Sequence, residues 1–291
     1  MKLSIIANPV AGRGRAYGRL KRYLDRWSHP DWEIEVLPTR CPEHAGEIAH
    51  ELVSNPPDVV AVCGGDGTLS EVASRVPDPP FPVALIPSGT ANVLARELSI
   101  PTDLVAALET ALARRSKRVD LGVLSGRSER RFLLMAGIGF DAFVVSRVRP
   151  ALKARLGLNA YVMNVLRAVR DYPMIPFHVI VEGESYPATG CVVANSKGYG
   201  GGLLFNPGAD LCDGMLDLVM IQGKSRLAYV RFIAGARLGK PPALPCVRRC
   251  RARKVRIEGP RGIWVHADGE LAGTLPVDIT LVPSSFPLVI P

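Results

Sequence analysis

The sequence predicts two domains: a parallel α/β domain of Rossmann-like type, followed by an antiparallel β-sandwich domain. Up to about residue 118, short apolar runs alternate with amphipathic stretches of helical periodicity, which favours a mostly parallel sheet. Beyond that point, most segments are strand-like runs separated by turns, which is typical of an antiparallel sandwich. A chain of 291 residues is long enough for two ordinary domains. We predict domains over residues 1–119 and 120–291.

The first domain contains strand patterns that are each followed by a turn and a helical pattern. Apolar runs predict strands over 3–7, 32–37, 59–63 and 82–86. Apolar residues at helical spacing predict helices over 17–27, 43–54, 69–76 and 103–115, and a further helix that begins near residues 90–92. This alternation is the one that parallel strands with crossover helices require.

In the second domain, the sequence predicts more strands than helices. Strands are expected over 119–124, 131–136, 177–182, 191–195, 216–221, 254–258 and 276–281. Helices are expected over 141–148, 159–172 and 227–238. The tail over 286–290 predicts one more strand, which is open to pair with either domain.

The net charge of +9 indicates acidic partners, such as nucleotides or an anionic membrane surface. Aromatic residues make up only 6% of the chain and no nucleic-acid motif is present, so we do not expect nucleic-acid binding. No apolar run reaches the roughly 18–20 residues that a membrane-spanning helix needs. The six cysteines are scattered and predict reduced thiols. We therefore expect a cytoplasmic protein without a signal peptide.

The stretch Gly64-Gly65-Asp66-Gly67-Thr68 lies between a buried strand and a helix, and it predicts an anion-binding loop. Glycine lets the backbone approach a ligand closely, and the unpaired amides of a helix start attract anions. Asp66 offers a carboxylate for a metal or a ribose hydroxyl, and Thr68 a hydroxyl for a phosphate oxygen. The loop is neither a Walker A sequence nor the dinucleotide pattern of three spaced glycines.

A second glycine-containing loop follows the first strand, over Asn8-Pro9-Val10-Ala11-Gly12. A third follows the strand over 82–86, in the stretch Pro87-Ser88-Gly89-Thr90. Loops at the carboxyl ends of neighbouring parallel strands lie together and commonly form a ligand site. The first two loops therefore predict one phosphate-binding cleft, and a helix is expected to begin in the third stretch.

Two carboxylates near the C-terminus, Asp268 and Glu270, flank Gly269 after a predicted strand over 262–265. In an extended segment, residues two apart point to the same side, so both are expected to face the cleft. Phosphoryl transfer to a hydroxyl needs a carboxylate that accepts the hydroxyl proton. Taken alone, the Asp-Gly pair equally indicates a hairpin turn with exposed acids. We expect His266 to pack or to make a local hydrogen bond.

Several stretches together resemble the diacylglycerol kinase catalytic-domain family, which includes sphingosine and ceramide kinases and bacterial lipid kinases. They are Asn8-Pro9-x-x-Gly12, residues 64–71, residues 87–92, residues 137–142, residues 213–218 and Asp268-Gly269-Glu270. Their order and spacing cover nearly the whole chain. Ser70 departs from the asparagine that is usual in the family, but it keeps a hydrogen-bonding group.

The resemblance implies that ATP and Mg²⁺ bind in a cleft between the domains. The implied nucleotide-binding residues are Asn8, Pro9, Val10, Ala11, Gly12, Thr39, Gly65, Asp66, Gly67, Thr68, Leu69, Ser70, Glu71 and Thr90. It also implies a structural magnesium site at Asp213 with the backbone oxygens of Asp210 and Met215, where oxygen ligands suit a hard cation. Asp141 matches a position near the lipid head group, although a helix N-cap explains it equally well.

The implied function is an ATP-dependent lipid kinase of phospholipid metabolism. Diacylglycerol, converted to phosphatidic acid, is the expected acceptor, and a sphingoid base, ceramide or phosphatidylglycerol stays open. Glu270 matches the proton acceptor, and Asp268 would support it or orient the hydroxyl. An NAD kinase-like phosphotransferase and a catalytically silent lipid- or nucleotide-binding protein are the alternatives. We expect peripheral contact with an anionic membrane through the basic stretches 147–155 and 248–254. A homodimer stays open as an assembly state.

Overall fold

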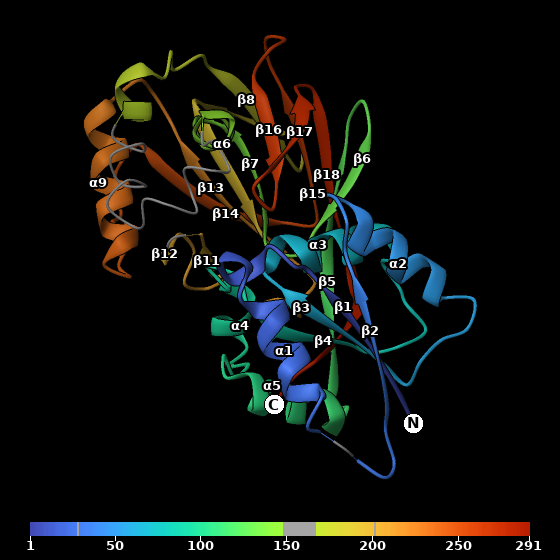
Figure 1. Ribbon diagram of the computed structural model, residues 1–291. Coiled ribbons are helices and arrows are strands. Elements are labelled where there is room, and N and C mark those ends of the chain that lie inside the picture. Colours follow the sequence, from blue (N-terminus) through green and yellow to red (C-terminus); the bar gives the residue numbers. More distant parts are fainter. Residues whose placement is uncertain (28, 148–166, 201) are drawn as a thin grey trace. The chain divides into compact units, whose positions relative to one another are not determined.

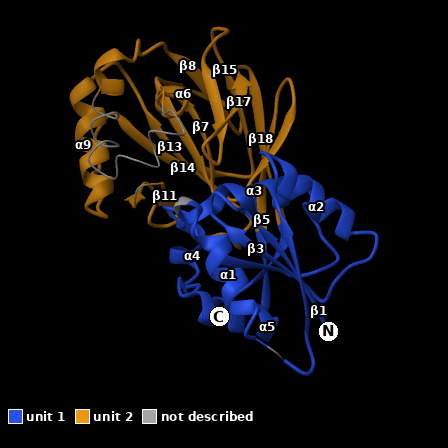
Figure 2. Ribbon diagram, viewed as in Figure 1, with its two compact units in different colours: residues 1–119, 284–291 blue, residues 120–283 orange. Residues whose placement is uncertain are grey.

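The computed structural model describes residues 1–27, 29–147, 167–200 and 202–291. The chain forms two compact units (Figure 2). Unit 1 comprises Met1–Val119 and Ser284–Pro291, and unit 2 comprises Asp120–Pro283. The predicted helix over 159–172 lies largely outside the described residues, as does most of the basic stretch 147–155. Among the described residues, no helix has the length and apolar character needed to cross a bilayer.

Unit 1 is built on a parallel sheet in the strand order β2-β1-β3-β4 (Figure 1). The strands are β1 (Lys2–Ala7), β2 (Glu33–Pro38), β3 (Val59–Gly64) and β4 (Val83–Pro87). Neighbouring strands are parallel throughout, and in β3 every residue is buried. The end of β18 (Val277–Val289) joins this sheet in parallel, where Leu288 lies opposite Val83. The tail strand therefore belongs to unit 1.

Helices cover both faces of this sheet because its strands are apolar on both sides. They are the 3₁₀ helix η1 (Ala11–Gly14), α1 (Ala16–Leu24), α2 (His44–Leu52), α3 (Asp66–Arg75), α4 (Val93–Glu97) and α5 (Leu104–Ala113). One core cluster joins alternate residues of β1 and β3, such as Leu3 and Ala61, to Leu20 of α1 and Leu108 of α5. The remaining side chains of these strands face the layer of α2 and α3.

Unit 2 contains a six-stranded antiparallel sheet in the order β14-β13-β10-β7-β16-β17. These strands are β7 (Met135–Gly139), β10 (Gly190–Ala194), β13 (Leu216–Ile221), β14 (Val247–Ala252), β16 (Trp264–Ala267) and β17 (Glu270–Thr274). Helices α6 (Phe140–Arg147) and α9 (Arg226–Arg237) and the short strands β11 (Gly198–Tyr199) and β12 (Leu203–Leu204) also belong to this unit.

A second antiparallel layer in unit 2 shares one apolar core with this sheet. It consists of β5 (Ser116–Ser125), β6 (Glu129–Phe132), β8 (Phe177–Val181), β9 (Glu184–Ala188), β15 (Lys254–Glu258) and the first part of β18. The core contains Phe132, Phe177 and Ile257 from this layer and Ile138 and Leu218 from the other. The prediction of a parallel α/β domain followed by an antiparallel β domain is confirmed.

Two predictions about single elements were wrong, and one strand of the basic stretch was missed. The strand expected over 131–136 is two strands, β6 and β7. The backbone amides of Leu133 and Leu134, which lie between them, donate to the carboxylate of Asp268 instead of to a neighbouring strand. The strand expected over 276–281 and the tail strand are one continuous strand, β18. The strand β14, which forms the first part of the basic stretch 248–254 and pairs with β13, was not predicted. Long-range pairing of this kind leaves little local signal in a sequence.

Candidate active site

Three loops of unit 1 meet at the carboxyl ends of β1, β3 and β4. The side-chain amide of Asn8 donates to the hydroxyl of Thr68 at 3.1 Å, which links the first loop to the second. A Cβ atom on Gly65 would lie 3.1 Å from the Cα atom of Gly89, so the second and third loops touch through their backbones. A Cβ atom on Gly12 would lie 3.1 Å from the Ser88 carbonyl oxygen, in the third loop.

Asp66 connects the second loop to the helix that follows the third loop. Its two carboxylate oxygens accept hydrogen bonds from the amides of Val93 (3.0 Å) and Leu94 (3.1 Å), at the start of α4. Anionic groups stabilise a helix N-terminus in this way. The sequence led us to expect this carboxylate to face a metal or a ribose, and it did not reveal this capping role.

The remaining predicted nucleotide residues differ in what their side chains contact. Glu71 accepts a hydrogen bond from the amide of Ala45 at 3.2 Å, near the start of α2. Leu69 is fully buried, so its side chain belongs to the core of unit 1. Thr39 follows β2 and donates its amide to the Ala7 carbonyl, while Thr90 is exposed in the third loop. In the first loop Val10 is exposed and Pro9 and Ala11 are half-buried, and Ser70 lies within α3.

In unit 2, Asp268 and Gly269 form the hairpin turn between β16 and β17. Both have positive φ angles, +48° and +85°, as the central residues of a type I′ turn do. The backbone at Asp268 is therefore not extended, and the argument that Asp268 and Glu270 point to the same side was wrong.

The Asp268 carboxylate is held by three backbone amides. Oδ2 accepts from Leu133 at 2.8 Å, and Oδ1 accepts from Leu134 and Met135 at 2.9 Å each. These amides belong to the segment that separates β6 from β7, so Asp268 fixes the turn to the neighbouring strand. A carboxylate bonded to several amides is stabilised in its charged form.

Glu270, by contrast, is half-exposed at the first position of β17. Its carboxylate lies 3.4 Å from the guanidinium of Arg130 on β6, and 51% of its side chain is accessible to solvent. Of the two carboxylates, that of Glu270 is therefore the more exposed to solvent.

Asp141, on the first turn of α6, accepts one hydrogen bond on each carboxylate oxygen. The Tyr199 hydroxyl donates to Oδ1 at 2.6 Å, and Nε2 of His266 lies 2.7 Å from Oδ2. Asp141, Tyr199 and His266 are all buried. The carboxylate is therefore a member of a buried polar network, and it does not act as a simple helix cap.

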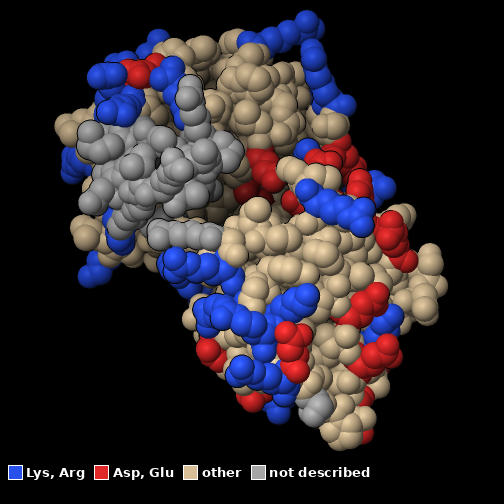
Figure 3. Space-filling view, viewed as in Figure 1, with Lys and Arg blue, Asp and Glu red and all other residues tan. Residues whose placement is uncertain are grey.

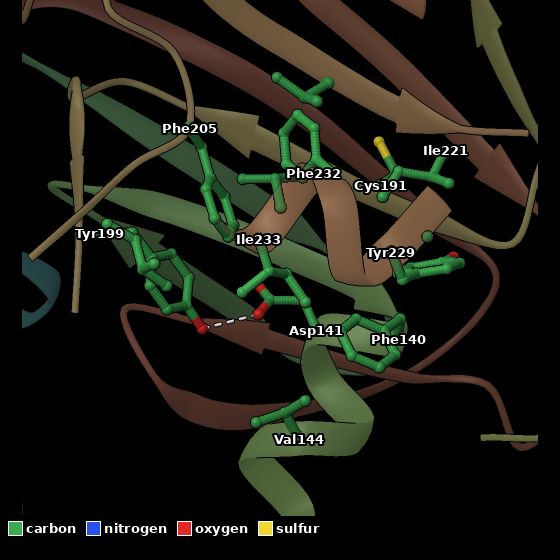
Figure 4. A pocket seen from close by; sticks show the side chains of 14 residues that line it. Phe140, Asp141, Val144, Cys191, Tyr199, Phe205, Ile221, Tyr229, Phe232 and Ile233 are labelled. Atoms are coloured by element: carbon green, nitrogen blue, oxygen red, sulfur yellow. Dashed lines mark hydrogen bonds between the residues drawn. The ribbon is translucent and has the colours of Figure 1, made fainter. Parts of the chain in front are cut away.

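An apolar pocket opens onto this carboxylate (Figure 4). Its empty space is about 520 Å³, a figure that includes open solvent at the mouth of the pocket. Most lining side chains are aromatic or aliphatic: Phe140, Val144, Cys191, Val192, Tyr199, Leu203, Phe205, Val219, Ile221, Tyr229, Phe232 and Ile233. Figure 4 shows Asp141 among them, bonded to Tyr199. Burial raises the pKa of the Cys191 thiol, which keeps it neutral in this lining.

The predicted magnesium residues lie in the loop before β13. Asp213 accepts the amide of Met215 at 3.0 Å on Oδ1, and its Oδ2 pairs with Arg251 of β14. The Arg251 guanidinium also lies 3.6 Å from Oδ1 of Asp217. Within the described residues, no group of three or more His, Cys, Asp or Glu side chains is arranged to hold a metal.

Two family models match the chain, one in each half. The diacylglycerol kinase catalytic domain matches residues 2–124, and the YegS C-terminal NAD kinase beta sandwich-like domain matches residues 135–290. The chain belongs to the diacylglycerol kinase catalytic-domain family.

Full-length relatives agree with this assignment. The chain is 30% identical to a diacylglycerol kinase of Mycobacterium tuberculosis (strain ATCC 25618 / H37Rv), over 100% of this chain and 95% of the relative. It is 26% identical to a diacylglycerol kinase of Bacillus subtilis (strain 168), over 94% and 90% of the two chains. A solved diacylglycerol kinase structure from Bacillus anthracis str. Sterne superposes with a TM-score of 0.78, at 26% identity, over 100% and 97% of the two chains. The protein is therefore a kinase, with ATP as its co-substrate.

Apart from Asp141, the residues that form the apolar pocket of this kinase were not predicted from the sequence. Tyr199, Phe205, Tyr229 and Phe232 come from segments spread over more than thirty positions, and none belongs to a recognisable motif. The hydrogen-bonding role of His266 with Asp141 was also missed. A buried histidine flanked by apolar residues was the available signal, but its partner lies 125 positions away in the chain.

Proposed function

We propose that this kinase transfers the γ-phosphoryl group of ATP to the free hydroxyl of diacylglycerol and releases phosphatidic acid. The observation that carries the proposal is the pocket in unit 2, where an apolar lining ends at the buried carboxylate of Asp141. Such a pocket suits an acyl chain that is attached to a small neutral head group. It does not suit the dinucleotide of an NAD kinase reaction, which carries two phosphates and several hydroxyls.

In the proposed mechanism, Glu270 accepts the proton of the lipid hydroxyl. The hydroxyl oxygen forms a bond to the γ-phosphorus, and the bond between that phosphorus and the bridging oxygen breaks, leaving ADP. Asp268 contributes by holding the turn, since its carboxylate is occupied by three amides. Its role is to position Glu270.

The three loops of unit 1 are the proposed nucleotide site. They bring together backbone amides near the start of α3 and leave little side-chain bulk at Gly65, Gly67 and Gly89, as an approaching phosphate requires. A buried acceptor, Oδ1 of Asn92, has no hydrogen-bond partner within the described part of the chain. Because an unpaired buried acceptor is costly, we assign it to a donor of the bound nucleotide.

A structural Mg²⁺ is proposed at Asp213, with the backbone oxygens of Asp210 and Met215. The donor set fits a hard cation, because all these ligands are oxygens and Oδ2 of the nearby buried Asp217 lacks a partner among the described residues. The bound ion would supply positive charge that holds this loop. Arg251 occupies that position in the structure, so it must turn away when the ion binds.

A diacylglycerol kinase meets its substrate at a membrane, so we propose a cytoplasmic protein that binds anionic membranes peripherally. Figure 3 shows Lys and Arg side chains in groups over the visible face, with Asp and Glu side chains between them. Arg253, which lies between β14 and β15, and Lys254, at the start of β15, are both exposed. Each basic residue near an anionic surface contributes about 1 kcal/mol of attraction.

The test is an assay with labelled ATP over a panel of acceptors: diacylglycerol, a sphingoid base, ceramide and phosphatidylglycerol in mixed micelles, and NAD in solution. We expect label in phosphatidic acid, and we expect that Glu270→Gln slows its formation by about 10²–10⁴-fold. Label mainly in another lipid would change the substrate. Label in NAD alone would overturn the proposal in favour of an NAD kinase-like enzyme. No label with any acceptor would favour a silent binding protein.

A further inference from the structure

His266 makes a hydrogen bond on each side of its ring, and the two bonds lead to different parts of unit 2. Nε2 lies 2.7 Å from Oδ2 of Asp141, whose carboxylate lines the apolar pocket. Nδ1 accepts the amide of Gly269 at 3.2 Å, in the turn that directly precedes Glu270. The imidazole is 1% exposed.

The Gly269 amide determines which ring nitrogen of His266 carries the proton. A backbone N–H can only donate, so Nδ1 must be the unprotonated acceptor. In the neutral ring the proton then lies on Nε2 and is donated to Asp141. The hydrogen bond at one ring nitrogen thus determines whether the other nitrogen donates or accepts, as it does in metal and catalytic sites.

The backbone of β7 passes so close to the contact between His266 and Asp141 that only a glycine fits beneath it. A Cβ atom on Gly137 of β7 would lie 2.1 Å from Oδ2 of Asp141 and 2.2 Å from Nε2 of His266. The pair therefore lies directly over a glycine of the strand next to β16. Tyr199 holds the other oxygen of Asp141, so the carboxylate cannot turn without losing a bond.

We propose that His266 is a positioning residue that couples the lipid pocket to Glu270. It transmits the position of the Asp141 carboxylate, which faces the bound lipid, to the turn that carries Glu270. This proposal rests on the proposed function for the role of Glu270. The coupling itself is a property of the hydrogen bonds and can be measured without the reaction.

Two substitutions of His266 test its two hydrogen bonds one at a time. The side-chain amide of Gln or Asn can replace only one of the two ring nitrogens. His266→Gln can still donate to Asp141 near the place of Nε2, but it loses the acceptor for Gly269. His266→Asn can still accept from Gly269 near the place of Nδ1, but it loses the donor to Asp141.

The kinetic result expected is a split between the two variants, measured with the lipid that the panel assay identifies. For His266→Gln, kcat falls by about 10- to 100-fold and the KM for lipid changes little, since a small misplacement of a catalytic group has this cost. For His266→Asn, the KM for lipid rises by about tenfold, as expected for a lost charge-assisted bond. Parallel changes in both constants for both variants would overturn the proposal.

A destabilised control separates positioning from loss of stability. Asp103→Ala removes the cap of α5 in unit 1, where Asp103 accepts from Val105 and Ala106, and it touches no site residue. It should lower the melting temperature and leave kcat and KM unchanged. If it changes them as the His266 variants do, the kinetic split reports stability alone and the proposal fails.

A second experiment does not depend on catalysis. It follows the NMR resonance of the Gly269 amide. Asp141→Asn should shift this resonance in the wild-type background but not in His266→Gln, where the connection is already broken. Tyr199→Phe should shift it too, whereas Tyr229→Phe should not, because the Tyr229 hydroxyl pairs with Thr189 outside the network. Equal shifts from Asp141→Asn in both backgrounds would overturn the coupling. A shift confined to the wild type, in a protein that phosphorylates no lipid, would refute the proposed function and leave the coupling intact.

Discussion

At the scale of single residues, neighbouring acids in one turn have different surroundings and therefore different expected roles. The Asp268 carboxylate accepts hydrogen bonds from three backbone amides, so its negative charge stabilises the fold. Glu270 is half-exposed, with 51% of its side chain accessible to solvent, and its carboxylate lies 3.4 Å from the guanidinium of Arg130. Burial and hydrogen bonding, rather than residue type, distinguish a structural acid from a reactive one.

The first prediction compares Asp268→Asn with Glu270→Gln. Asp268→Asn weakens three charge-assisted bonds, so we expect a loss of about 2 kcal/mol in the free energy of unfolding. For a unit of this size, that lowers the melting temperature by about 4–8 °C. Glu270→Gln should leave the melting temperature unchanged and reduce kcat by about 10²–10⁴-fold, the usual contribution of a general base. Calorimetry and initial rates measure both. A Glu270→Gln enzyme of normal rate would remove Glu270 from the mechanism.

The second prediction uses Gly67, the second residue of α3. A Cβ atom at this position would meet no protein atom within 4 Å, so Gly67→Ala should fold normally and gain slightly in helix stability. If the loop binds ATP, the new methyl group should lower ATP affinity, as calorimetric titration would detect. Gly18→Ala in α1 is the matched control, since its Cβ atom also meets nothing. Equal ATP affinity in both variants would contradict the loop assignment.

At the scale of elements, the loop before β13 and the strand β14 depend on each other through charge. Asp213 belongs to the loop, Asp217 to β13 and Arg251 to β14, and the guanidinium contacts both carboxylates. Burial raises the pKa of the Asp217 carboxyl, and the Arg251 charge opposes that rise. A cation that binds this loop therefore competes with an arginine that already performs the same electrostatic task.

The third prediction follows from this competition. Mg²⁺ should raise the melting temperature of the wild type, because an ion that binds only the folded state stabilises it. Asp213→Asn should abolish that increase. Arg251→Ala should be less stable without Mg²⁺ but gain more from it, since the competing guanidinium is gone. Melting curves with Mg²⁺ and with a chelator test all three. A wild type that melts at the same temperature in both would show that Arg251 replaces the ion entirely.

The fourth prediction concerns the pH dependence of stability without Mg²⁺. The raised pKa means that folded Asp217 binds a proton more tightly than unfolded Asp217 does. Stability therefore falls as the pH rises from the ordinary value of about 4 through the folded pKa, and it is constant above that value. The Asp217→Asn variant has no carboxyl group that titrates at this position. The difference between its melting temperature and that of the wild type should therefore shift in favour of the variant as the pH rises over the same range. A difference between the two proteins that does not change with pH would contradict the assignment.

At the scale of the whole molecule, the sequence predicted what depends on local periodicity and missed what depends on distant partners. The strand–loop–helix order of unit 1 followed from apolar spacing and glycine position, so its strands were found. The pocket combines α6, α9, β10 and the segment around Tyr199 and Phe205, which no single window of sequence contains. The capping of α4 by Asp66 and the bond between His266 and Asp141 were missed for the same reason.

The last prediction is that the basic residues around β14 and β15 bind anionic membranes. Three arginines of this stretch have partners in the protein: Arg248 lies over Tyr186, Arg249 over Phe232, and Arg251 pairs with Asp213. Reversing their charges would therefore disturb the fold as well as the surface. The exposed residues Arg253 and Lys254 are the cleaner choice.

The double variant Arg253→Glu with Lys254→Glu should bind vesicles that contain phosphatidylglycerol at least about 30-fold more weakly. The loss of two basic residues alone removes about 2 kcal/mol of attraction, and the two new carboxylates are repelled by the anionic surface. Rates on detergent-dispersed lipid should change little, because neither residue contacts the pocket. Arg261→Glu, a charge reversal at another exposed position, is the control and should retain most vesicle binding. Sedimentation with vesicles measures binding, and added salt should weaken it in the wild type. If the control weakens binding as much as the double variant, the attraction belongs to the net charge rather than to this stretch.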